Sequence, residues 1–272
     1  YGETGATLLI LALPLFKNIL NDYWVALDLD NYNGDKVSHD TPYLKELIET
    51  VLSLDLVELS NGNLDLAVLD SKIDVIIDNI NALELFKGHM NSLVELLLRD
   101  LVYGKKIAGK VVPADSFNVE NVDFENDNTQ LKELVHLAVK FFASVNVYNL
   151  NEVKDYVKNV SVKELASDNN SMMIVADMLD VLSNVTFVNE NLKTLYELYV
   201  VPALENRNLL KYFDYRDATN EEMVADLAVA SVIVRDLVDI NAGKILNGEV
   251  IEYVNSEREG VTVSEIVSSL VN

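Results

Sequence analysis

The stretch DLDNYNGDKVSHD, residues 28–40, has side chains that could bind a calcium ion. Carboxylate and amide oxygens crowd around a glycine, as they do in calcium-binding loops. If Gly34 takes the sixth position of an EF-hand loop, the first ligand position holds Leu29 and the apolar eighth position holds Lys36. The candidate ligands are Asp28, Asp30, Asn33, Asp35 and Asp40. The alternative interpretation is a turn between helices that is rich in Asn and Gly.

A second kind of metal site is suggested by Glu133 and His136, which form an E-x-x-H pair. Carboxylate-bridged di-iron sites in helical bundles need two such pairs and two further glutamates on facing helices. The chain has three histidines and no second pair of this kind. We therefore expect His136 to be a surface or partly buried histidine of a helix. Calcium is the one cofactor that the sequence suggests.

Two groups of aromatic residues beside Asn and Asp could form a platform that binds a protein or a glycan. The candidates are Tyr23, Trp24, Tyr32, Tyr212 and Tyr215. The competing interpretation is that the single Trp of a helical protein this long anchors the hydrophobic core.

Motifs that would indicate catalysis are missing from the sequence. There is no serine nucleophile elbow, no phosphate-binding glycine loop and no dinucleotide-binding fingerprint. The absence of cysteine excludes thiol nucleophiles, disulfides and Cys-ligated metals. We therefore predict that the protein is not an enzyme. The rival hypothesis is an enzyme whose carboxylates are brought together only by the fold.

Helices must position these residues, because apolar side chains recur at helical spacing along most of the chain. Residues 44–52 are one example, and the pattern returns at 73–80, 135–142 and 175–182. For the first of these helices, Asp40 or Thr41 is the expected N-cap and Pro42 the expected first residue. Scarce glycine and proline, 10 and 4 residues, disfavour sandwiches and barrels that need many tight turns.

The segment LKEL occurs twice, at 44–47 and 131–134. Several periodic segments also end in one pattern, a small or polar residue followed by apolar, polar and apolar ones, as at 82–85 and 184–187. A helix, a corner and a returning helix form the αα-hairpin from which helical arrays are built. The copies stand roughly 29, 62 and 102 residues apart, whereas solenoids keep a near-constant period. Two explanations remain open: a degenerate repeat, and helices that merely share common residue patterns.

Residues 104–128 interrupt the helical pattern with glycine, proline and β-branched residues, which indicates a connector or a small β-hairpin. Asp127 or Asn128 is the expected cap of a helix that starts near Thr129. We predict a mainly α protein, an antiparallel helix-hairpin array or two helical lobes at 1–103 and 129–272. Any β structure is expected at about 105–125.

Acidic residues outnumber basic ones by 44 to 21, for a net charge of −23. Such a charge repels nucleic acid and anionic membranes. The densest basic cluster, Lys105, Lys106 and Lys110, is too small to reverse that effect. The apolar run at 6–16 is shorter than the roughly 20 residues of a membrane span and contains Pro14. We expect a buried first helix there and no transmembrane segment.

These features together favour a non-catalytic interaction or structural module that binds another protein or a glycan. The start at Tyr1 and the missing cysteines suggest a fragment of a secreted or cell-surface protein. One alternative is a cytoplasmic helical scaffold or regulator. Another is a helical protein that binds a small apolar ligand in a cavity between its helices. The sequence names no partner.

Overall fold

A computed structural model describes residues 21–107, 109–160, 165, 168–206, 210–212, 214–239, 257–258 and 261–262. The described chain is mainly helical, as the sequence predicted. The helix expected at 6–16 lies outside the described residues.

The α-helices are α2 (Asn21–Ala26), α3 (Gly34–Leu52), α4 (Leu56–Asn61), α5 (Leu66–Ala82), α6 (Met90–Leu101), α7 (Phe124–Ser144), α8 (Leu150–Asn159), α10 (Asn169–Ser183), α11 (Thr186–Leu195), α12 (Val201–Asn206) and α13 (Asn220–Asp239). Short turns of 3-10 helix are η2 (Leu29–Asn31) and η4 (Leu210–Tyr212), and η3 (Tyr196–Val200) is a π-helical turn.

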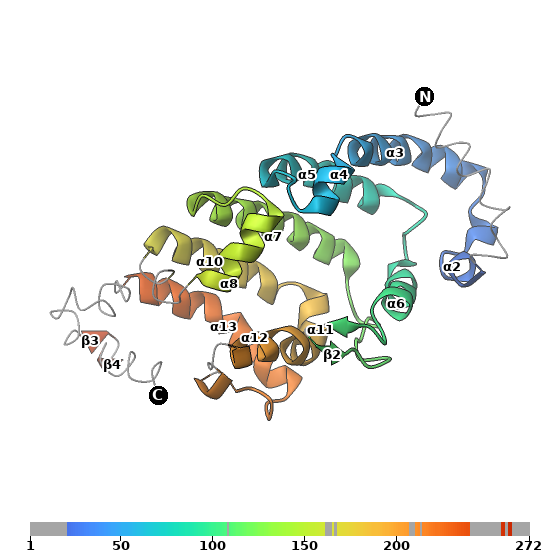
Figure 1. Ribbon diagram of the computed structural model, residues 1–272. Helices are drawn as coiled ribbons and strands as arrows, with labels where there is room; N and C mark the ends of the chain where they lie inside the picture. Colours follow the sequence, from blue (N-terminus) through green and yellow to red (C-terminus); the bar gives the residue numbers. More distant parts are fainter. Residues whose placement is uncertain are drawn as a thin grey trace.

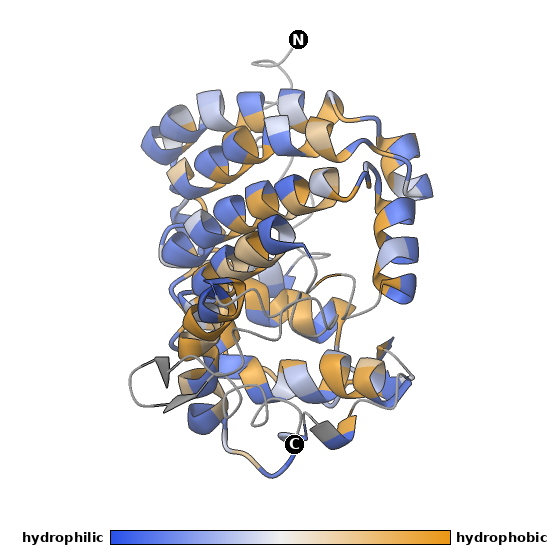
Figure 2. Ribbon diagram, turned by 90° about the vertical axis from the view of Figure 1, so that its left-hand side faces the viewer, coloured by the Kyte–Doolittle hydropathy of each residue, from blue (hydrophilic) through white to orange (hydrophobic). Residues whose placement is uncertain are grey.

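Five long helices lie side by side in the order α3, α5, α7, α10 and α13, each packed against the next (Figure 1). Hydrophobic and hydrophilic residues alternate within the turns of these helices, which is the pattern of amphipathic helices (Figure 2). The buried apolar side chains include Ile73 and Ile77 of α5 and Ile174 of α10. The array is therefore held together by the apolar stripes that the sequence periodicity indicated.

Two parts of the array have the same order of described elements. Unit 1 consists of α3, the short α4, α5 and the corner at 83–88. Unit 2 consists of α7, the short α8, α10 and the corner at 184–187. The two LKEL segments occupy equivalent places, in the first helix of each unit. This correspondence favours a repeated unit over helices that merely share common residue patterns.

A buried aspartate joins the first helix of unit 1 to its corner. Asp40 of α3 is 0 % exposed. Its carboxylate accepts hydrogen bonds from the backbone N–H groups of Glu84 and Leu85, both at 2.9 Å. The Tyr32 hydroxyl donates a further one at 2.9 Å, and a ring nitrogen of His39 lies 2.9 Å away. These partners compensate for burying the carboxylate.

Unit 2 repeats this connection. Asp127 of α7 is 7 % exposed, and its carboxylate accepts from the backbone N–H groups of Thr186 and Phe187 at 2.6 and 2.7 Å. The Thr186 hydroxyl adds a bond of 2.9 Å. Both aspartates stand four residues before LKEL. The equivalence of the units thus extends to the individual hydrogen bonds.

The starts of both first helices differ from the sequence prediction. α3 begins at Gly34, where the Asn33 side chain caps it, so Pro42 lies inside the helix. α7 begins at Phe124 and is capped by Asp123 rather than by Asp127 or Asn128. The predicted cap residues Asp40 and Asp127 instead reach a distant corner, a partner that local sequence rules cannot reveal.

The segment between the units contains the expected β-hairpin. β1 (Lys106–Ile107) pairs antiparallel with β2 (Lys110–Val111). The remainder of the connector contributes Val112 and Phe117 to a buried cluster with Leu198. A second pair of strands, β3 (Glu257–Arg258) and β4 (Val261–Thr262), lies outside the segment that the sequence indicated. The division into lobes at 1–103 and 129–272 stays a prediction, and α5 and α7 pack together across it.

Charged side chains line the contact between α5 and α7, which we call the α5–α7 seam. Lys132 Nζ of α7 lies 2.8 Å from a carboxylate oxygen of Asp78. The two ring nitrogens of His136 lie 2.7 Å from Asp70 and 3.0 Å from Asp74. A neutral imidazole can donate through only one nitrogen, so both contacts are hydrogen bonds only when the ring is cationic. The hydrogen bonds to Asp74 and Asp70 accordingly raise the pKa of His136.

Within the described part of the chain, no single helix is long and apolar enough to cross a membrane. The pair Asn169–Ser183 and Thr186–Asn206, which bends by 103°, meets the requirement by length and composition only.

Replacing Asp127 with Asn should lower the free energy of unfolding by about 2 to 3 kcal/mol. The amide keeps the shape, but its NH₂ group would face a backbone N–H that needs an acceptor. The measurement is urea unfolding followed by circular dichroism. Glu133→Gln makes the same chemical change at an exposed site of the same helix and should alter stability by less than about 0.5 kcal/mol. Equal effects of the two variants would contradict the role of the buried carboxylate.

The contribution of the α5–α7 seam to the free energy of unfolding should decrease as the pH rises. The pKa of His136 is raised on folding, so its contribution is fully present below the unfolded-state pKa of about 6.5 and is lost as the pH passes the higher folded-state pKa. Chemical unfolding between about pH 6 and 8 should show this loss. His136→Gln should remove that part of the pH dependence. A variant with the same pH profile as the natural chain would show that the seam does not depend on the charge.

Candidate functional site

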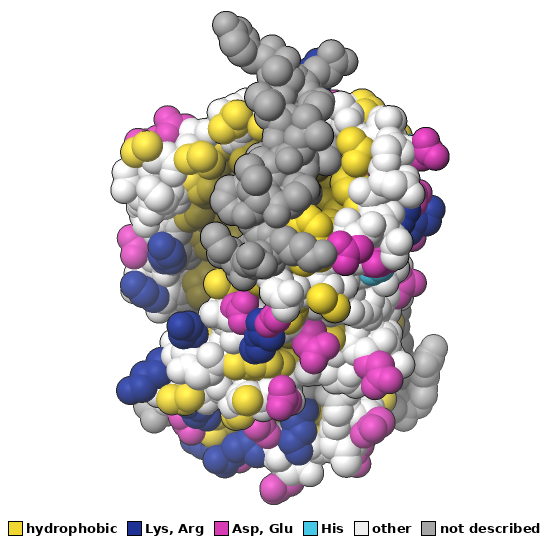
Figure 3. Space-filling view, turned by 90° about the vertical axis from the view of Figure 1, so that its right-hand side faces the viewer, with side chains coloured by type: hydrophobic (Ala, Val, Ile, Leu, Met, Phe, Trp, Pro, Cys, Tyr) yellow, Lys and Arg dark blue, Asp and Glu magenta, His cyan; other side chains and the backbone are white. Residues whose placement is uncertain are grey.

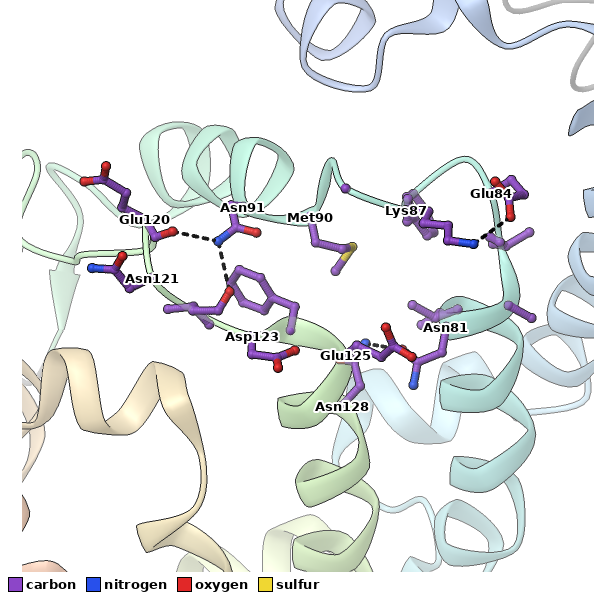
Figure 4. Close-up of a pocket in the computed structure, with 17 residues that line it drawn as sticks. Asn81, Glu84, Lys87, Met90, Asn91, Glu120, Asn121, Asp123, Glu125 and Asn128 are labelled. Carbon is purple, nitrogen blue, oxygen red and sulfur yellow. Dashed lines mark hydrogen bonds and ion pairs between the residues drawn. The ribbon is translucent and has the colours of Figure 1, made fainter.

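An open cleft of about 560 Å³ lies at the junction of the two units, and we call it the junction cleft. The end of α5, the corner at 83–88 and the start of α6 form one side. The connector at 120–123 and the first turns of α7 form the other (Figure 4). The side chain of Met90 extends into the space between them. The cleft therefore exists because the two units meet at this place.

The hydrogen bonds of Asp40 fix the shape of one wall. Because its carboxylate holds the amides of Glu84 and Leu85, the corner cannot move independently of α3. Leu83, 1 % exposed, anchors the same corner in the core. The wall is thus preformed rather than a free loop.

Two asparagines hold the connector, which forms the opposite wall. Asn91 of α6 donates to the carbonyl oxygens of Val119 and Val122 at 2.6 and 3.0 Å. Asn191 of α11, 2 % exposed, binds the backbone of Asn118 at both its N–H and its carbonyl group, at 2.6 and 2.8 Å. The helix that follows each unit thus contributes one amide side chain that pairs with the main chain of the connector.

The rim of the junction cleft is acidic. Its carboxylates are Glu84, Glu120, Asp123 and Glu125, and its one cation is Lys87. Lys87 Nζ lies 3.1 Å from the carboxylate of Glu84. Four negative charges against one positive charge leave three negative charges in excess. The rim should attract a cationic group and repel an anionic one.

The lining of the junction cleft offers hydrogen-bonding groups, four carboxylates and one amine. None of its residues is Ser, Thr, Tyr, Cys or His, so it has no hydroxyl, thiol or imidazole that could act as nucleophile or base. Asn81 and Asn128 are bonded to each other at 2.6 Å across the α5–α7 seam. The cleft is suited to holding a ligand.

Comparison with known proteins assigns no family: no family model, no curated protein and no solved structure matches this chain. Its function must therefore be inferred from its own side chains and surfaces.

A second hollow, of about 420 Å³, lies between the η3–α12 segment and α13, and we call it the apolar groove. Leu192, Tyr196, Leu204 and Leu227 contribute to its lining. Tyr215, 40 % exposed, also lines it and packs edge-on against Tyr196 with ring centres 6.1 Å apart. Tyr215 is thus a predicted aromatic binding residue that lines a hollow in the surface.

The other predicted aromatic residues have structural partners. Trp24 is buried, at 7 % exposure, which agrees with the core interpretation. The Tyr23 hydroxyl donates to Asp100 at 2.9 Å. Burial and the bond to the Asp40 carboxylate raise the pKa of Tyr32. Tyr212 belongs to η4, and its side chain lies outside the described structure.

The predicted calcium ligands Asp28 and Asp30 have local partners. The backbone of Asp28 is left-handed, with φ 48°, and its carboxylate accepts from the Asn31 side chain at 2.9 Å. Asp30 accepts a hydrogen bond from the Trp24 indole at 3.0 Å. These contacts close the turn before α3.

The remaining predicted ligands are part of α3 or its cap. Asn33 is the N-cap, Asp35 lies in the first turn and Asp40 is buried against the corner at 83–88. Within the described ranges, no group of three Asp, Glu or His side chains is placed to hold a metal ion. The geometry thus favours the alternative of a turn between helices, and the calcium site gains no support.

On the face that carries α2 and α6, Lys and Arg side chains gather along one edge of the lower half, whereas acidic side chains lie toward the other edge (Figure 3). Hydrophobic side chains are exposed among them. The surface is therefore not uniformly acidic, although the chain has a large negative charge.

Sequence analysis missed the role of Asp127, which joins α7 to the corner at 184–187, and it missed Asn91 and Asn191, which hold the connector. For Asp127 a signal existed, since an aspartate precedes both LKEL segments by four residues. For the asparagines there was none, because the chain is rich in Asn and their partner is the main chain.

Asn191→Ala should release the connector. The variant removes two hydrogen bonds to one residue of the connector and leaves its N–H without a partner. Glutamyl endopeptidase should then cleave after Glu120 at least several-fold faster, as measured by mass spectrometry. Ala114→Ser, an exposed change in the same connector away from the Glu120–Asn121 bond, is the control and should leave the rate unchanged. Unchanged cleavage of Asn191→Ala would mean that the apolar contacts hold the connector without the amide.

Proposed function

We propose that this chain is a non-catalytic interaction module that binds a partner protein. The observation that carries the proposal is the junction cleft, which is preformed and acidic and has no hydroxyl, thiol or imidazole side chain in its lining. Helical arrays present ridged surfaces of this kind to protein partners. The stacked units of this chain form a helical array of this kind.

The partner segment that suits the junction cleft is an extended stretch with Lys or Arg. Its cations would meet the carboxylates of the rim, of which Glu120, Asp123 and Glu125 have exposed side chains. The stems of Lys and Arg are apolar and could lie on Phe86 and Met90. A volume of about 560 Å³ accommodates a few residues of such a segment.

A glycan is the alternative partner, because amides and carboxylates also hydrogen-bond to sugar hydroxyls. We place the module outside the cell or on its surface, with a cytoplasmic scaffold as the alternative. Detection of the protein on intact cells with an antibody tests this location. The apolar groove supports the further alternative of a small apolar ligand, although its open form leaves such a ligand partly exposed to water.

Charge reversal at the rim tests the proposal. A labelled, unstructured peptide of Lys, Arg, Gly and Ser should bind the chain, and its fluorescence anisotropy reports the affinity. Glu120→Lys with Glu125→Lys should weaken binding at least tenfold. Glu205→Lys with Asp217→Lys changes the net charge equally at exposed sites outside the cleft lining and should weaken it by less than threefold.

Equal losses in the two pairs of variants would mean that only the overall negative charge attracts the peptide, and the proposal would fail. Binding of a neutral oligosaccharide that competes with the peptide would favour the glycan alternative.

A further inference from the structure

α13 takes the position of the first helix of a third unit. It packs against α10, the second helix of unit 2, as α7 packs against α5, the second helix of unit 1. The charges correspond as well. Arg235 of α13 lies 2.9 Å from Asp177 and 3.9 Å from Asp180 of α10. In the α5–α7 seam, cations of a first helix likewise face aspartates of the preceding second helix.

The side of α13 turned away from α10 is apolar and exposed. Val229, Val232 and Ile233 are 50, 55 and 44 % exposed. On the side that faces α10, Ser231 is buried at 1 % exposure, and its hydroxyl lies 3.4 Å from the carboxylate of Asp180. We call the exposed side, together with the small Ala225 and Ala228, the outer face of α13.

The first helix of unit 2, α7, shows which element packs on the corresponding face. α7 contacts α5 on one side and α10 on the other, where Ser144 and Ser171 are hydrogen-bonded at 3.2 Å. In unit 2, the second helix α10 thus packs on the side of the first helix α7 that is opposite unit 1. On α13, that side is the outer face, and its apolar side chains are exposed.

The opposite end of the array differs in composition. Most side chains that α3 exposes are polar, among them Ser38, Glu46 and Glu49, and the exposed Leu52 stands at its last position. A polar outer face is what closes a helical array against water. The outer face of α13 lacks this property, and an apolar helix face of this kind marks an interaction site.

The apolar groove borders the outer face, and the buried Met223 of α13 also lines it. Asp226, Leu227 and Ala230 of α13 line the groove, and Ile233 follows one turn later on the same side of the helix. Tyr215 and Val200 form the far wall. A helix laid on α13 could place large side chains in this hollow.

The edges of the outer face are acidic. Glu222 and Asp226 are exposed on α13, two turns and one turn before Val229. A second copy of this chain would bring the same acidic edges and a further net charge of −23 to the interface. Charge complementarity therefore selects a partner with basic residues.

We propose that the outer face of α13 and the apolar groove bind an amphipathic helix of a partner protein, in which Lys or Arg flanks an apolar stripe. The bound helix takes the place of the second helix of a third unit. This inference rests on the proposed function as an interaction module, but it uses a surface separate from the junction cleft.

The probe is a labelled synthetic peptide of about 18 residues, with Leu at helical i, i+3, i+4 and i+7 positions and Lys or Arg beside the stripe. A peptide of equal composition with the Leu positions scrambled is the control. Fluorescence anisotropy with the full chain should show at least tenfold tighter binding of the striped peptide.

Matched variants locate the binding surface. Val232→Ser with Ile233→Ser should weaken binding of the striped peptide at least tenfold. Leu52→Ser with Val57→Ser removes comparably exposed aliphatic groups, 68 and 66 %, in the first unit and should leave the affinity unchanged. The cleft variants Glu120→Lys with Glu125→Lys should change it by less than threefold, so failure of the cleft proposal and failure of this one are distinguishable.

Three results would overturn the inference. Equal binding of the striped and scrambled peptides would show attraction by charge alone. A lower melting temperature of the Val232→Ser, Ile233→Ser variant without peptide would show that the chain itself covers the face. Sedimentation of the natural chain as a dimer that these substitutions dissociate would make a second copy the occupant.

Discussion

A carboxylate buried between a first helix and the corner after the second helix sets the geometry of both units. A buried charge is unfavourable unless hydrogen bonds replace its lost water, and Asp40 and Asp127 each accept two consecutive backbone N–H groups. Those N–H groups belong to corners where the helical hydrogen-bond pattern is interrupted, so they need acceptors too. Each carboxylate thus fixes the second helix and the following element relative to the first helix.

Contacts between units follow a different principle. At the α5–α7 seam and between α10 and α13, aspartates of a second helix face cations of the next first helix. These pairs are partly exposed, and exposed ion pairs contribute little stability individually. Their effect is to set register and orientation, while the apolar stripes of the helices supply the attraction. A chain with few cations places several of them where consecutive units meet.

Both proposed binding surfaces arise from the same repetition. The junction cleft opens where the corner of unit 1 and the start of unit 2 meet across a connector held by Asn91 and Asn191. The outer face of α13 is the side on which a further second helix would pack. Both surfaces follow from the stacking of similar units: one forms where two units meet at the connector, and the other lies on the last described helix of the stack.

The sequence by itself determined the helical class, the corners at 82–85 and 184–187 and the small hairpin between the units, because periodicity, turn residues and β-branched residues act over short distances. It also indicated Trp24 as a core residue under one of its two interpretations. Only the tertiary structure decided the roles of Asp40 and Asp127, which local rules treat as helix caps or loop ligands. Their backbone N–H partners stand more than 40 residues away in the sequence, and the energy of a buried carboxylate depends on the groups that surround it in space.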